Sequence, residues 1–275
     1  MSRKALATIA LVAAGWMAGG IASPAAEKAA PDKAAVDAAF DALKTFDWGS
    51  DRKVLRPLED AVVVSHGDAA ARRSLESRLA AVVKSGAPRA AKDFACRQLS
   101  LIGTAASVPT LAANLADKDL SHMARYALER IPGPEPAAAL REALPKLSGR
   151  TQAGVIVSLG VLRDASSVTA LAGLLSSADA EVAAAAATSL GAIGTPEAVT
   201  AVNNFQKSAP QQLRPIVANA CLAGAEQLLA AGKKAEAMAV YKTLVGPEQP
   251  KHVRLAATRG MLAAAGKKPQ KEAKP

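Results

Sequence analysis

The chain has 275 residues and a formal net charge of +10; half of its residues are hydrophobic, but only 3% are aromatic. Alanine and leucine supply most of the hydrophobic residues, which suits closely packed helices and argues against carbohydrate or base-stacking sites, because those use aromatic platforms. No β-rich segment occurs, and the basic balance is compatible with nucleic acid, an anionic membrane surface or an acidic polymer as a partner.

Residues 1–25 have the pattern of an export signal. Arg3 and Lys4 precede an uncharged run over residues 5–22, which ends in small residues that suit cleavage. We therefore predict a Sec-type signal peptide and a periplasmic or secreted protein. A retained N-terminal membrane anchor is the alternative, because the uncharged run approaches the length of a membrane span. Cleavage would lower the formal charge to +8.

Residues 26–88 are predicted to form an N-terminal helical cap with a degenerate repeat. Helices are expected over residues 32–46, 52–65 and 68–84, with Asp68 as an N-cap, because each carries hydrophobic residues at helical spacing. Trp48 is predicted to be buried at the end of the core, and an exposed ligand platform is the alternative. The hydrophobic positions are Val36, Phe40, Leu43, Val54, Leu55, Leu58, Val62, Val63, Leu75, Leu79 and Val82.

An internal repeat organises residues 89–210. Each copy has a reference leucine, a small or β-branched residue four positions earlier, and a leucine or isoleucine three positions later. A period near thirty with two helical stripes is typical of an α-solenoid, so we predict an all-α stack of helical hairpins. The reference leucines are Leu99, Leu128, Leu159 and Leu190, spaced 29, 31 and 31 residues apart, and the earlier residues are Ala95, Ala124, Val155 and Ala186.

Glycine and proline are expected to separate the two helices of each copy. Gly103 and Gly194 follow the first apolar stripe, where a left-handed residue costs glycine little. Pro132 and Pro196 prevent the first helix from continuing. The second helix of each copy then carries its own apolar stripe.

Residues 211–266 are predicted to form a longer helical hairpin and a terminal repeat. Leu222 and Met261 are taken as the next reference positions, and the turn that contains Gly232 separates two helices. Residues 267–275 are rich in lysine and are predicted to be a basic flexible tail.

The residues with reactive side chains give no catalytic pattern. Cys96 and Cys221 should lie several layers apart, because layers stack at roughly 8–10 Å and a disulfide needs Cα atoms within about 7 Å. We predict that both are buried and unpaired. The histidines His66, His122 and His252 have no metal-ligand spacing, and no nucleophile elbow or phosphate-binding glycine loop is present. No catalytic, cofactor-binding or metal residue is therefore assigned.

Two segments resemble a known repeat family. CRQLSLIGTAASVPTLAANLAD at residues 96–117 and AAATSLGAIGTPEAVTAV at residues 185–202 are similar to HEAT repeats, in the short variety named after the phycobilin lyases. The resemblance covers about residues 92–207. It implies a curved right-handed solenoid with protein-binding surfaces, and most proteins with this repeat are not lyases.

The leading hypothesis is a non-catalytic, exported scaffold that binds a protein partner of unknown identity, as a monomer or within a hetero-complex. No nucleic acid, cofactor or stable membrane insertion is expected. The polar second-helix positions that would face a groove are Asn114, Glu142, Asn203 and Asn204, although no binding site is assigned.

The resemblance also suggests an accessory role in extracellular polysaccharide breakdown, because similar exported HEAT segments are sometimes joined to keto-disaccharide hydrolase or cytochrome domains. An enzyme or a nucleic-acid-binding protein, of the chromophore lyase or DNA glycosylase type, is the alternative. His122 and Arg125, with His252 and Arg254, open first helices, where they would form either a polar ridge or ordinary solvated helix starts.

Overall fold

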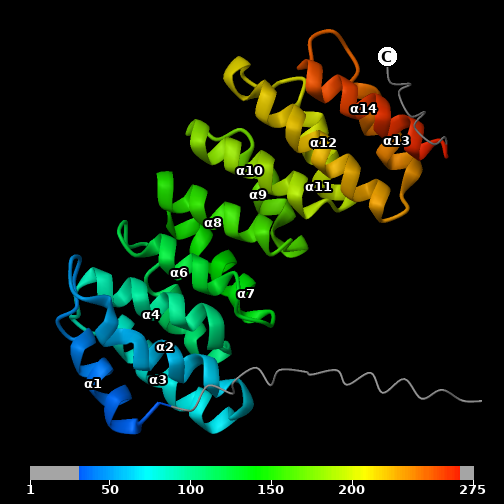
Figure 1. Ribbon diagram of the computed structural model, residues 1–275. Helices are drawn as coiled ribbons and strands as arrows, with labels where there is room; N and C mark the ends of the chain where they lie inside the picture. Colours follow the sequence, from blue (N-terminus) through cyan, green and yellow to red (C-terminus); the bar gives the residue numbers. More distant parts are fainter. Residues whose placement is uncertain (1–30, 267–275) are drawn as a thin grey trace, which may run out of the picture.

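A computed structural model describes residues 31–266, and the elements in this part of the chain are helices joined by turns. The predicted signal peptide at residues 1–25 and the tail at residues 267–275 lie outside the described residues. Figure 1 shows the helices as paired layers that follow one another along a curved axis, from α1 at one end to α14 at the other. The all-α solenoid predicted from the repeat is confirmed.

The described helices divide into three groups. The N-terminal group is α1 (Lys33–Leu43), α2 (Arg56–Val64) and α3 (Ala69–Lys84). The first helices of the following copies are α4 (Arg89–Ile102), α6 (Ser121–Leu128), α8 (Gly149–Val161), α10 (Ala180–Ile193), α12 (Arg214–Ala230) and α14 (Lys251–Ala264). The second helices are α5 (Val108–Ala112), α7 (Glu135–Ala143), α9 (Val168–Leu174), α11 (Pro196–Phe205) and α13 (Lys234–Thr243).

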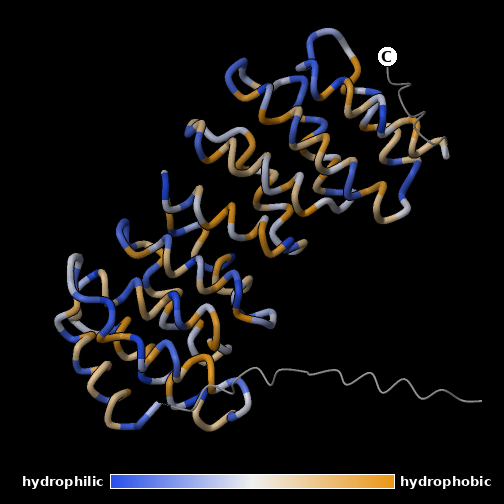
Figure 2. The backbone as a smooth tube through the Cα atoms, in the orientation of Figure 1, coloured by the Kyte–Doolittle hydropathy of each residue, from blue (hydrophilic) through white to orange (hydrophobic). Residues whose placement is uncertain are grey.

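The first helices stack on one another in chain order, and each second helix packs beside them. The four reference leucines and the four residues that precede them by one turn have no exposed surface. Equivalent positions of successive copies therefore form one lengthwise core, as the repeat predicts. Figure 2 shows hydrophobic and hydrophilic stretches alternating along the helices, as expected when one face of each is buried.

Close backbone contacts fix the register between copies. A Cβ on Gly160 would lie 2.7 Å from the Ser189 side chain, and a Cβ on Gly191 would lie 2.5 Å from the Ala220 carbonyl oxygen. Both contacts join residues 29 positions apart, so Ser189 and Ala220 are equivalent. The reference position of the next copy is consequently Cys221, which is fully buried. The prediction of Leu222 was wrong by one residue, because that leucine is only partly buried against the core.

Helix ends agree with the expected capping, with one exception. Asp68 accepts hydrogen bonds from the backbone N–H groups of Ala70 and Ala71, which confirms it as an N-cap. Gly194 is left-handed with φ 69° after α10. Gly103 is extended instead, with φ −61°. Glycine is needed there for space, because a Cβ would collide with the Leu99 carbonyl and touch the Ile131 side chain.

The N-terminal helices bury most of the predicted stripe. Val54 and Val63 are exceptions, being 46% and 56% exposed, because they lie off the face that buries Leu55, Leu58 and Val62. In α3, Leu75 and Leu79 are buried as predicted, but Val82 is only partly buried and its neighbour Val83 is buried instead.

The prediction that Trp48 is buried at the end of the core is wrong. Its side chain is 71% exposed. The residue lies in the turn after α1, where its backbone N–H donates to Asp47 Oδ1 at 2.8 Å. Phe40 and Leu43 already fill the buried face of α1, so the tryptophan is left outside the core.

Candidate functional site

A groove lies at the C-terminal end of the stack. It has a volume of about 460 Å³ and is formed where α11 ends, α12 begins, and the loop after α13 leads into α14. We call it the amide groove, because four side-chain amides line it. Its lining residues are Asn203, Asn204, Gln206, Lys207, Arg214, Pro215, Thr243, Glu248, Gln249 and Pro250.

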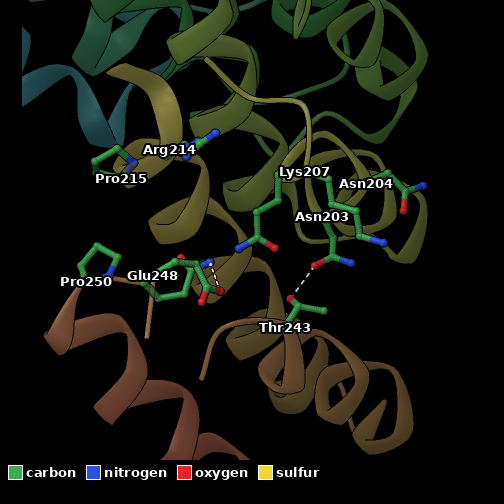
Figure 3. A pocket seen from close by; sticks show the side chains of 10 residues that line it. Asn203, Asn204, Lys207, Arg214, Pro215, Thr243, Glu248 and Pro250 are labelled. Carbon is green, nitrogen blue, oxygen red and sulfur yellow. Dashed lines mark hydrogen bonds between the residues drawn. The ribbon is translucent and has the colours of Figure 1, made fainter. Parts of the chain in front are cut away.

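Figure 3 shows the residues that line the groove, with Asn203 and Thr243 turned toward one another. Thr243 Oγ1 donates to Asn203 Oδ1 at 2.9 Å and so joins α13 to α11. Gln249 Nε2 donates to Glu248 Oε1 at 3.3 Å. The Gln206 Nε2 atom is buried and has no hydrogen-bond partner within the described part of the chain. The groove thus presents donors and acceptors between two proline rings.

The four polar positions named from the sequence do not form one site. Asn203 and Asn204 line the amide groove. Glu142 lies in a separate hollow of about 320 Å³ between α5 and α7, where it accepts a hydrogen bond from Lys146 at 2.8 Å. Asn114 lies just after α5 and donates to the Thr110 carbonyl of that helix at 2.8 Å. Sequence reasoning missed Gln206 and Gln249, because both lie beyond the regular apolar stripes.

A third hollow, of about 580 Å³, lies at the starts of α4, α6 and α8. We call it the basic cleft. Figure 1 shows that the loops leading into the first helices follow one long edge of the stack. The amide groove and the basic cleft are lined by residues of these loops and helix starts, so both lie on that edge. The lining residues are Arg89, Lys118, Asp119, Ser121, His122, Arg125, Ser148, Arg150 and Thr151.

Arg125 is the most buried cation of the basic cleft. Its guanidinium lies flat against Gly154, where a Cβ would come within 2.6 Å of Cζ. Its Nη1 donates to the Gly154 carbonyl at 3.1 Å and to Ser158 Oγ at 3.3 Å. Burial lowers the pKa of Arg125 below its usual value, and the Glu129 carboxylate opposes that shift. Only glycine at position 154 leaves room for this arrangement.

Comparison with known proteins supports the repeat assignment. A family model of HEAT repeats matches residues 137–223, which run from α7 into α12. The chain contains HEAT repeats. Among solved structures it is similar to an engineered protein from a structural genomics programme, with 20% identity over 76% of this chain and 96% of that chain and a TM-score of 0.38. No curated protein matches the chain.

The remaining reactive groups of this HEAT protein are dispersed. Within residues 31–266, no group of three metal-ligating side chains is close enough to hold an ion. His252 shares a hydrogen bond of 2.9 Å with Asn219, and His66 lies 3.0 Å from Arg72 Nη2. His122 and Arg125 both line the basic cleft, whereas His252 and Arg254 do not. None of the helices in the same range is long and apolar enough to cross a membrane.

Proposed function

We propose that this HEAT protein is a non-catalytic scaffold that holds an extended segment of a partner protein in the amide groove. The observation that carries the proposal is that Asn203, Asn204, Gln206 and Gln249 line one groove of about 460 Å³. HEAT repeats commonly mediate protein interactions, and the family match supports this class of function.

Side-chain amides suit a peptide ligand because each offers an acceptor oxygen and two donor hydrogens. An extended peptide presents the complementary carbonyl and N–H groups along its backbone. Recognition of that kind depends on backbone shape more than on partner side chains. Pro215 and Pro250 add apolar walls without competing donors.

Site-specific photo-cross-linking tests this proposal. A benzophenone amino acid at position 204 should capture a discrete partner in intact cells that naturally contain the protein. The same group at Thr188, an exposed position on α10, is the matched control. A cross-link that forms equally at both positions, or at neither, would contradict binding in the amide groove.

Export is proposed as part of the same function. The pattern of residues 1–25 supports it, and the measurement is the N-terminus of the protein isolated from cell fractions. A periplasmic or secreted protein that begins near residue 26 is expected. A cytoplasmic protein that still begins at Met1 would contradict export.

An accessory role in extracellular polysaccharide breakdown is proposed from the resemblance to exported HEAT segments. Identification of the partner cross-linked at position 204 decides it. A polysaccharide-degrading enzyme, or a protein encoded with one, is the expected result, and a partner of another class would remove this part of the proposal.

A further inference from the structure

The charges of the basic cleft are not balanced by its own acids. Arg89 is paired, since its Nη1 lies 3.1 Å from Asp119 Oδ1 and its Nε lies 3.7 Å from Asp93 Oδ2. Lys118 and Arg150 form no ion pair with any described residue, and Arg125 forms none within 4 Å, although the Glu129 carboxylate is close enough to raise its pKa. Three cations therefore share a hollow of about 580 Å³ whose one lining acid is already neutralised.

Two buried polar atoms at the cleft also lack partners. Ser121 is 4% exposed, and its hydroxyl makes no hydrogen bond in the described structure. The Nε atom of Arg125 is buried and unpaired in the same way. Buried polar groups are normally satisfied, so unpaired ones at the wall of a cavity indicate that something else completes the site.

The free edge of Arg125 has the geometry for an oxyanion. Its Nη1 is committed to Gly154 and Ser158 on α8. The second terminal nitrogen, Nη2, forms no hydrogen bond with a described residue, so it can donate a charge-assisted hydrogen bond to a carboxylate. The first turns of α4, α6 and α8 lie at the cleft and add the positive ends of three helix dipoles.

We propose that the basic cleft binds an acidic, extended segment of the partner protein, with one carboxylate at Arg125 and others at Lys118 and Arg150. The inference rests on the proposed scaffold function and names a second contact surface for it. The cleft is far larger than one phosphate group requires, and its cations come from successive copies. Layers separated by roughly 8–10 Å match about three residues of extended chain at about 3.3 Å each.

The same observations favour a peptide over nucleic acid. Single-stranded nucleic acids stack their bases on aromatic side chains along a basic groove. The cleft has no phenylalanine, tyrosine or tryptophan among its lining residues, and its polar groups include the hydroxyls of Ser148 and Thr151. Charge complementarity to a carboxylate-bearing chain is what the cleft offers.

Isothermal titration with a defined peptide tests the proposal. The probe is a nine-residue peptide with glutamate at every third position, and its control has glutamine there. The full protein should bind the glutamate peptide at least about tenfold more tightly than the glutamine peptide, and the difference should shrink as salt is raised. Absence of saturable binding up to about 1 mM would overturn the proposal.

Charge-reversal variants locate the binding. Arg150→Glu should weaken the glutamate peptide about tenfold or more, because Arg150 is exposed and its replacement leaves the core intact. Lys234→Glu makes the same change of charge at the exposed start of α13 and should alter affinity by less than about twofold. Equal effects of the two variants, with unchanged melting temperatures, would overturn the assignment to the cleft.

Titration of two other anions tests whether the cleft prefers a carboxylate-bearing peptide. Inorganic phosphate and a thymidine oligonucleotide are titrated under the same conditions, and each should bind more weakly than the glutamate peptide. Tighter binding of either would assign the cleft to that ligand and overturn the proposal. Success of cross-linking at position 204 alongside failure of peptide binding would leave the scaffold function standing and remove only the basic cleft.

Discussion

Gly191 of α10 lies directly against the backbone of α12. A Cβ there would stand 2.5 Å from the Ala220 carbonyl oxygen and 2.9 Å from Ala220 Cα, and backbone atoms cannot rotate away. Gly191→Ala should therefore destabilise the fold by about 1–3 kcal/mol, the usual cost of overpacking. Urea unfolding, monitored by circular dichroism, measures the change.

Gly173 provides the matched control for Gly191. It also lies inside a helix, α9, but a Cβ there would have no heavy atom within 4 Å. Gly173→Ala should stabilise the protein by about 0.5–1 kcal/mol, because alanine loses less backbone entropy in a helix. Destabilisation by both variants to the same extent would refute the close contact at Gly191.

The two cysteines give a second prediction at the residue scale. Cys96 and Cys221 are unpaired and fully buried, and burial raises the pKa of each thiol to about 12. Because the thiolate is the reactive form, neither should react with Ellman's reagent at pH 8 in the native protein. Both should react in urea without reductant. Fast reaction of one thiol in the folded state would contradict its burial.

At the scale of elements, Glu76 connects α3 to the turn between α4 and α5. This carboxylate is 3% exposed, and its Oε1 accepts from the Thr104 backbone N–H at 2.7 Å and from Ser107 Oγ at 2.6 Å. Glu76→Ala should cost at least about 2 kcal/mol, because it removes both hydrogen bonds and leaves the buried Ser107 hydroxyl without an acceptor, which alone costs about 1–3 kcal/mol. Glu226→Ala, an exposed change on α12, should stay within about 0.5 kcal/mol. Similar unfolding midpoints for both variants would contradict this role.

These elements also show where sequence reasoning succeeds. Burial of Leu99 and Leu190 follows from a repeat that places the same residue at the same depth in each copy, so periodicity alone predicts it. Glu76 escapes prediction because a buried carboxylate depends on partners that lie 28 and 31 residues away. Trp48 was wrongly placed because hydrophobicity does not reveal that the core beneath a turn is already filled.

The candidate sites were only partly predictable for a related reason. Asn203 and Asn204 could be named because they follow an apolar stripe on one helix. The basic cleft combines side chains from three copies, and its depth depends on how closely those copies approach. Gly154 sets that approach at Arg125, through a contact that no local pattern encodes.

At the scale of the molecule, the stack is not uniformly cohesive. The central helix α10 packs extensively on both α8 and α12, whereas the shorter α6 packs much less on α8. In a solenoid each repeat contacts mainly its neighbours, so local stability follows local packing. Hydrogen exchange should therefore be slowest in α10 and faster in α6 and α7.

The same argument predicts which helices a destabilising substitution affects. Ala186 has no exposed surface, so Ala186→Glu places a carboxylate in the seam around α10, where burying an unpaired charge is strongly unfavourable. Hydrogen exchange should accelerate in α8, α10 and α12, while α1 to α3 keep their protection because they share no contact with that seam. Thr188→Glu adds the same charge at an exposed position of the same helix and should leave exchange nearly unchanged. Acceleration across every described helix in the Ala186 variant would mean that the stack unfolds as one cooperative unit, contrary to the nearest-neighbour behaviour expected of its repeats.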